Sequence, residues 1–153
     1  MRLFLLFALL LLSPLARAKE YVSFFGLVIE QRYLPNVEPE CPVGGICMDV
    51  VYRWTIQIDK LISGKLSGKT VKAARIQHAK FIYAHQRQAL YVLSYIEDER
   101  KRKLLGADYW LEEYAPPSTV YCLESNDDYG LGSNDSVFLL SGTHGCYRKD
   151  PNS

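Results

Sequence analysis

The sequence predicts an all-β protein, a small antiparallel barrel of five to six strands with at most one short helix. The strongest observation is the stretch from Val50 to His78, which begins with apolar and polar residues alternating as in a half-buried strand. A glycine- and lysine-rich turn at residues 63–69 joins this strand to a return strand. Because an open sheet would leave exposed edges, closure into a barrel is the most economical arrangement.

Three further patterns predict the N-terminal half of the chain. Residues 20–34 are rich in β-branched and aromatic residues, and their apolar parity changes at Gly26, which predicts a bulge or a coiled strand of a small barrel. Residues 35–47 hold three prolines and two glycines and are expected to form a loop. A change of parity in the return strand predicts a second bulge near Ala73 and Ala74.

The C-terminal half begins with residues 88–96, which are apolar or aromatic on both faces and predict a central strand covered on two sides. Residues 97–105 place acids four positions before bases and end at Gly106, which fits either a short surface helix or a charged turn. A loop is expected at residues 125–134 and a disulfide-tied tail at residues 142–153. The remaining strands are expected at residues 108–114, 118–123 and 137–140.

Residues 1–18 have the features of a signal peptide. Arg2 precedes an apolar run from Leu3 to Leu12, and residues 16–18 supply the small-x-small pattern of a cleavage site. The run is too short to cross about 30 Å of hydrocarbon as a helix, so no membrane anchor is expected after cleavage. We therefore expect a periplasmic or secreted protein with a single barrel domain over residues 19–153.

The charge balance gives no reason to expect nucleic acid as a partner. The chain has 18 basic and 17 acidic residues, and loss of Arg2 and Arg17 with the signal peptide leaves 16 against 17, which changes the net charge from +1 to −1. A nearly neutral chain has no overall attraction for nucleic acid or an anionic membrane. The basic clusters at residues 65–72 and 100–103 are interpreted as solvated surface.

Four cysteines follow the expected secretion signal, which favours two disulfides. They are Cys41, Cys47, Cys122 and Cys146, and three pairings are possible. Cys41–Cys47 would close a small ring over two glycines, and Cys122–Cys146 would then tie the last strand to the tail, a bond worth about 3 kcal/mol. A zinc or redox site is not predicted, because no CxxC motif or zinc-like Cys/His spacing is present.

A packing pattern runs through three segments between Val22 and Ile96: FFGLVIEQRYL, RWTIQIDKLISGKLSGKTV and LYVLSYI. It resembles the netrin-like branch of the OB fold, the group that includes tissue inhibitors of metalloproteinases. The resemblance implies an OB-like barrel, and such packing motifs carry little functional information. It does not imply protease inhibition, because those inhibitors cap the protease zinc with an N-terminal cysteine. The expected N-terminus here is Lys19, and the cysteine framework also differs.

No catalytic constellation is recognisable in the sequence. Residues from Ser141 to His144 bring hydroxyls and a histidine together, but local adjacency is not the geometry of a catalytic triad. Glu112 and Glu113 are expected to point to opposite faces of a strand, so they cannot act as a carboxylate pair. The histidines show no metal-ligand spacing, so no metal or cofactor is predicted. A small secreted hydrolase or metal-binding protein using His144 or His85 is the alternative function.

The aromatic content is the remaining functional signal, because the chain holds eleven tyrosines. Trp54 lies on the inward parity of its strand and is expected in the core. Other aromatic residues could line one face of the barrel, where OB barrels bind extended ligands, or could instead fill the interior. The sequence therefore predicts a non-catalytic binding module for a protein or an envelope polymer. The candidate ligand-binding residues are Tyr91, Tyr95, Tyr109, Trp110, Tyr114 and Tyr121.

Overall fold

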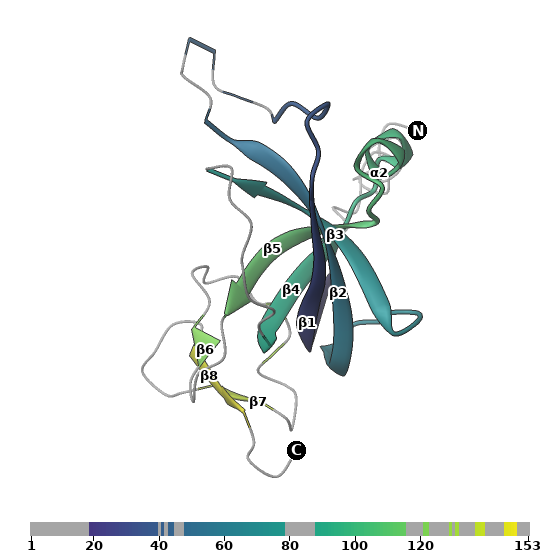
Figure 1. Cartoon of the computed structure of the whole chain (residues 1–153). Helices are drawn as coiled ribbons and strands as arrows, with labels where there is room; N and C mark the ends of the chain where they lie inside the picture. Colours follow the sequence, from purple (N-terminus) through teal and green to yellow (C-terminus); the bar gives the residue numbers. More distant parts are fainter. Residues whose placement is uncertain are drawn as a thin grey trace, which may run out of the picture.

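The computed structural model describes residues 19–39, 41, 43–44, 48–78, 88–115, 121–122, 129, 131, 137–139 and 146–149. Five strands form a closed barrel in the order β1-β2-β3-β5-β4 (Figure 1). The predicted class, a small all-β OB-like barrel, is confirmed, although β3 and β5 pair in parallel while the other neighbours are antiparallel. The strands are β1 (Tyr21–Tyr33), β2 (Val50–Ser63), β3 (Thr70–Gln77), β4 (Gln88–Tyr95) and β5 (Tyr109–Ala115).

Strand β1 closes the barrel because it pairs with β2 along one edge and with β4 along the other. Its register with β2 shifts between Phe25 and Gly26, so the irregularity predicted at this glycine is confirmed. A Cβ atom on Gly26 would lie 2.4 Å from the backbone oxygen of Gln57. The two backbones approach too closely here for any side chain, which explains the glycine.

The second predicted bulge, near Ala73 and Ala74, is wrong. The β2–β3 register is unbroken from the Val50–Gln77 pair to the Gln57–Thr70 pair. Both alanines are fully buried. Ala73 packs among the apolar side chains inside the barrel, whereas Ala74 packs in an apolar cluster on its outer face. The loss of apolar alternation therefore reflects a second covered face of the sheet and not an extra residue.

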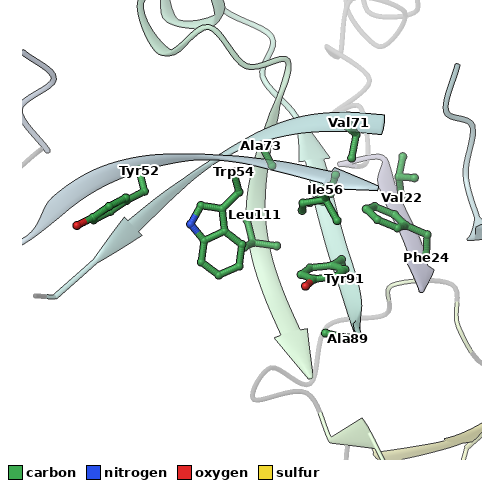
Figure 2. Packing of buried hydrophobic residues seen from close by; sticks show 11 residues of the cluster. Val22, Phe24, Tyr52, Trp54, Ile56, Val71, Ala73, Ala89, Tyr91 and Leu111 are labelled. Carbon is green, nitrogen blue, oxygen red and sulfur yellow. The ribbon is translucent and has the colours of Figure 1, made fainter. Parts of the chain in front are cut away.

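The barrel interior is filled by buried side chains from all five strands (Figure 2). Trp54 is 2% exposed and Tyr52 is 1% exposed, so the expectation that Trp54 belongs to the core is confirmed. Its indole contacts the ring of Tyr114 edge-on, with the ring centroids 5.8 Å apart. Trp54 is thus the largest fully buried side chain of the described residues.

Two further apolar clusters cover the outside of the barrel. In the first, Leu90 and Val92 of β4 pack against Tyr129 and Leu131, two buried residues from the region predicted as a loop. Because Tyr91 points into the interior instead, β4 is covered on both faces, as predicted. The second cluster comprises Val51, Ala74, Ile96, Leu105 and Ala107.

The charged segment after β4 forms the helix α2 (Glu99–Leu105), so the helical alternative is correct. The Asp98 side chain accepts hydrogen bonds from two backbone N–H groups of the first turn and caps the helix. Gly106, with a φ of 60°, ends the helix in the left-handed conformation. One predicted ion pair forms within the helix, between Glu99 and Lys103 at 2.7 Å.

The C-terminal part of the chain adds a second, three-stranded sheet in the order β6-β8-β7. Its strands are β6 (Tyr121–Cys122), β7 (Val137–Leu139) and β8 (Cys146–Lys149). The disulfide-tied tail expected after residue 142 contains a strand that was not predicted, β8, which pairs with both β6 and β7. The tail is held by backbone hydrogen bonds in addition to any disulfide.

Replacing Trp54 with alanine should lower the free energy of unfolding by about 3–5 kcal/mol, because it would leave a large cavity in the interior. Urea denaturation followed by far-UV circular dichroism measures this loss. Met48→Ala, at a 58% exposed position, is the control and should change the free energy by no more than about 0.5 kcal/mol. An unchanged denaturation midpoint for Trp54→Ala would contradict the interior assignment.

Candidate ligand-binding surface

Helix α2 lies outside the barrel, against the outer face of β2 and β3 (Figure 1). OB barrels bind ligands on this face, together with the β1–β2 and β4–β5 loops, and α2 is part of the β4–β5 connection. Leu105 is the one buried residue of the helix, and it clusters with Val51 and Ala74. With so narrow an apolar contact, the helix leaves a hollow on each side.

The first hollow is a cavity of about 400 Å³ between the end of β1, the turn that follows it and the C-terminal end of α2. Three basic side chains line it: Arg32, Arg53 and Lys103. None of its described lining residues is acidic. We call this hollow the cationic cavity.

Arg53 lies beside the C-terminal end of α2 within the cationic cavity. Its side chain is half-buried, and a Cβ atom on Gly106 would lie 2.6 Å from its Nη1 atom. The glycine that ends α2 therefore leaves the space that the guanidinium occupies. The Nε atom of Arg53 is buried and has no hydrogen-bond partner among the described residues. A buried donor without an acceptor is unfavourable, so this arginine carries a cost in the folded protein.

Arg32 and Arg53 are direct register partners on β1 and β2. The Cβ atoms of such partners are about 4.5–5.5 Å apart, and like charges in this position are destabilising. Glu30, the nearest acid along β1, accepts a hydrogen bond from Thr55 at 3.0 Å. Neither arginine forms an ion pair within the described part of the chain. Two cationic side chains thus stand side by side without an ion-pair partner among the residues that the structure describes.

The second hollow, of about 260 Å³, lies on the other side of α2 and is mainly apolar. Ile76 of β3 and Leu104 of α2 line it and are 48% and 59% exposed, and Trp110 of β5 is half-buried there. Glu38 and Lys101 are its charged residues. Contiguous exposed apolar side chains are a feature of interaction sites, which makes this hollow a candidate. We call this hollow the apolar hollow.

The two hollows are continuous, because Val37, Leu104 and Leu105 line both. They also lie along one row of register partners, which runs from Arg32 through Arg53 and Ala74 to Trp110. We call the combined surface the α2 face. It is cationic at one end and apolar at the other. An amphipathic ligand with an anionic group would match both ends.

A third hollow, of about 440 Å³, lies beside the β2–β3 turn. Tyr95 and Tyr109 line it and contact each other edge-on, with ring centroids 5.7 Å apart. Burial, and secondly the charge of Asp108, raise the pKa of Tyr109. Asp108 and Lys72 balance each other in charge, so this hollow lacks the uncompensated groups that distinguish the α2 face.

Arg75 packs against two aromatic side chains of the barrel. The Arg75 guanidinium lies over the rings of Trp54 and Tyr114, at 5.0 and 4.4 Å from their centroids. Tyr114 stacks on Tyr91 with the centroids 6.4 Å apart. Burial raises the pKa of Tyr91 far above its ordinary value, the neighbouring Tyr114 raises it further, and the charge of Arg75 opposes the rise in part.

The aromatic residues predicted to line a ligand face do not share one surface. Tyr91 is 1% exposed in the interior, and Tyr114 packs against it. Tyr95 and Tyr109 line the third hollow, whereas Trp110 lines the apolar hollow. The set is therefore divided between interior packing and two separate surface sites, and Trp110 is its member on the α2 face.

Glu112 and Glu113 do not lie on opposite faces of their strand as predicted. The register of β4 with β5 shifts after Val92, and a bulge of this kind interrupts the alternation of side chains. Glu112 accepts a hydrogen bond from Ser94, and Glu113 accepts one from Tyr129 at 2.8 Å. Both partners lie on the outer side of β4, so both carboxylates point outward and each has its own hydrogen-bond donor.

Several predicted features lie outside the described residues. These are the signal peptide at residues 1–18, Cys47, and the two histidines of the alternative function, His85 and His144. No described helix is both long and apolar enough to cross a membrane. For three further residues only the backbone is described: Tyr121, Cys122 and Cys146.

His78 is the histidine that the structure describes, and its Nδ1 atom lies 3.0 Å from a carboxylate oxygen of Asp49. The pair is exposed, because the His78 side chain is 80% accessible. Within the described ranges, no group of three or more histidine, cysteine, aspartate or glutamate residues could hold a metal ion. The pair is a surface contact, of the kind that contributes little to stability.

Comparison with known proteins finds no match among protein families, curated sequences or solved structures. The α2 face therefore has to be argued from its own geometry. Sequence patterns do not single out Arg32 or Arg53, because each occupies an ordinary polar position of an alternating strand. The register between β1 and β2 brings them together, and no short motif encodes that register.

Raising the pH above about 10 should destabilise the protein in part through Tyr91. Its phenol keeps its proton in the folded protein but ionises near its ordinary pKa of about 10 in the unfolded chain, so the free energy of unfolding falls as pH rises. Urea denaturation between about pH 8 and pH 11 measures this slope. Tyr91→Phe should flatten it, whereas Tyr95→Phe, at a 47% exposed position, should not. Equal slopes for Tyr91→Phe and the unchanged protein would contradict this account.

Proposed function

We propose that the protein is an exported, non-catalytic binding module that holds a protein ligand on the α2 face. The observation that carries this proposal is the junction of the cationic cavity and the apolar hollow on the outer face of β2 and β3. Each end contains groups that would gain free energy from a partner: the adjacent Arg32 and Arg53, and the exposed Ile76 and Leu104.

A protein ligand fits the α2 face better than a polysaccharide of the cell envelope. Ile76, Leu104 and Trp110 give the apolar hollow few groups that could bond to sugar hydroxyls. Desolvating hydroxyl groups there without new hydrogen bonds would cost free energy. A polypeptide can place an apolar side chain in the hollow and keep its polar groups elsewhere.

We further propose that the barrel is of the netrin-like type. The supporting observations are the strand order β1-β2-β3-β5-β4 and the position of the three similar segments, which fall on β1, on the β2–β3 hairpin and on β4. Protease inhibition is not part of the proposal, because the first cysteine of the chain after residue 18 is Cys41. The proposed ligand surface depends on α2 and not on the N-terminus.

Export and two disulfides complete the proposal. Residues 1–18 support export, as argued from their sequence. Cys122 and Cys146 are register partners in the β6–β8 pair. The Cα atoms of such partners are about 4.5–5.5 Å apart, a separation that a disulfide can span. In addition, no free cysteine is found among the described residues.

Peptide mapping without reduction should find Cys122–Cys146 and Cys41–Cys47 as the cross-links of the purified protein. Replacing Cys122 and Cys146 by serine should lower the free energy of unfolding by about 3 kcal/mol, because their bond closes a longer loop of the unfolded chain. Replacing the other pair should cost less, since its ring is small. A free thiol at Cys122 or Cys146 in the purified protein would overturn this pairing.

The binding function is tested by capture on the immobilised protein from the periplasmic or extracellular fraction of the source cells. A ligand that binds the α2 face should be lost when Ile76 and Leu104 are both replaced by glutamate, because charges would then occupy the apolar hollow. The matched control replaces Ile29 and Leu61 by glutamate as well. These two residues are 42% and 40% exposed but line neither hollow. Equal capture by both variants would place the ligand elsewhere.

A further inference from the structure

We infer that the ligand enters the cationic cavity with a carboxylate, and that the partner presents an acidic residue close to a large apolar one. This inference rests on the proposed binding function of the α2 face and adds the chemistry of the ligand. It starts from the adjacent positions of Arg32 and Arg53. Their repulsion is a cost that the folded protein carries and that a bound anion would relieve.

The chemistry of guanidinium groups favours a carboxylate as that anion. Each guanidinium presents a planar fork of N–H donors that matches the two oxygens of a carboxylate. The Arg53 guanidinium lies beside Gly106, at the C-terminal end of α2, where it lines the cationic cavity.

A purely structural role does not account for the whole arrangement. The C-terminal end of α2 attracts cations, which explains why one arginine lies beside Gly106. It does not explain why Arg32 stands directly opposite Arg53, nor why the Nε atom is left without an acceptor. A structural arginine predicts a loss of stability on substitution and no dependence on any ligand.

The apolar hollow decides between a polypeptide and a sulfated or phosphorylated polymer. Val37 and Leu104 line both hollows, so a ligand anchored in the cationic cavity reaches apolar surface at once. A sulfated polymer is polar along its whole length and would bury exposed apolar side chains poorly. Arg53 and Trp110 are two strand spacings apart along the row, roughly 10 Å, which an extended peptide covers in about three residues.

The test is a nuclear magnetic resonance titration of the ¹⁵N-labelled protein, produced from its full chain. The probe is a short acetylated and amidated peptide with one glutamate and, about three to four residues later, one phenylalanine. A matched peptide carries glutamine in place of glutamate. The Nε–H signal of Arg53 reports on the cationic cavity. The chain holds two tryptophans, so the indole signal of Trp110 reports on the apolar hollow, with buried Trp54 as the internal control.

The glutamate peptide should shift the Arg53 and Trp110 signals to saturation. The glutamine peptide should shift Trp110 alone and bind about tenfold more weakly or worse, because it offers no charged acceptor. Arg32→Gln, at an exposed position, should weaken binding of the glutamate peptide about tenfold and leave the glutamine peptide unaffected. Arg100→Gln removes the same charge from an exposed residue outside both hollows and should change neither affinity.

The results that would contradict the carboxylate inference can be distinguished from those that would contradict the proposed binding function. Equal affinity for the two peptides, with a shift of Trp110, would overturn the carboxylate and leave the α2 face as a binding surface. The absence of any shift with either peptide would overturn the inference, and the capture experiment would then decide the function alone. Dextran sulfate is the third probe. If it shifts the Arg53 signal to saturation and neither peptide does, the cationic cavity binds a sulfated polymer instead.

Discussion

The fold depends on one strand that hydrogen-bonds to two neighbours at once. Strand β1 pairs with β2 along one edge and with β4 along the other, and this closes the sheet on itself. The closure requires a close approach of two backbones beside Gly26, where no side chain fits. Once the sheet is closed, one face of every strand is directed inward, and Trp54 and Tyr91 occupy the space that this creates.

Closure leaves the outer face of the barrel to be covered by other elements, and the cover is uneven. Tyr129 and Leu131 are themselves buried where they pack on β4. Over β2 and β3 the cover is α2, a short and highly charged helix that buries Leu105 alone. The proposed binding surface arises from this partial cover, because a wider apolar helix would have filled both hollows. The position of the site thus follows from the composition of the connection between β4 and β5.

The direction of side chains was predictable from sequence in strands that have one buried and one exposed face. Tyr52, Trp54 and Ile56 alternate with polar residues, and their inward direction follows from that period alone. Prediction failed where a second surface intervened, since Ala74 is buried under α2, and where a bulge in β5 turned Glu112 outward. The arginine pair escaped prediction for a related reason: Arg32 and Arg53 are 21 positions apart, and only the register makes them neighbours.

The narrow attachment of α2 also has a dynamic consequence. Burial of one leucine contributes about 1.5–3 kcal/mol, so lifting the helix would sacrifice far less apolar contact than opening the barrel. Asp98 and Gly106 stabilise the two ends of the helix through its own backbone, so it can move as a unit without melting. Segments with few buried apolar contacts open more readily than the core of a protein. Movement of α2 alone would change the width of the proposed groove, whereas the arginines of β1 and β2 belong to strands that are paired in the closed barrel.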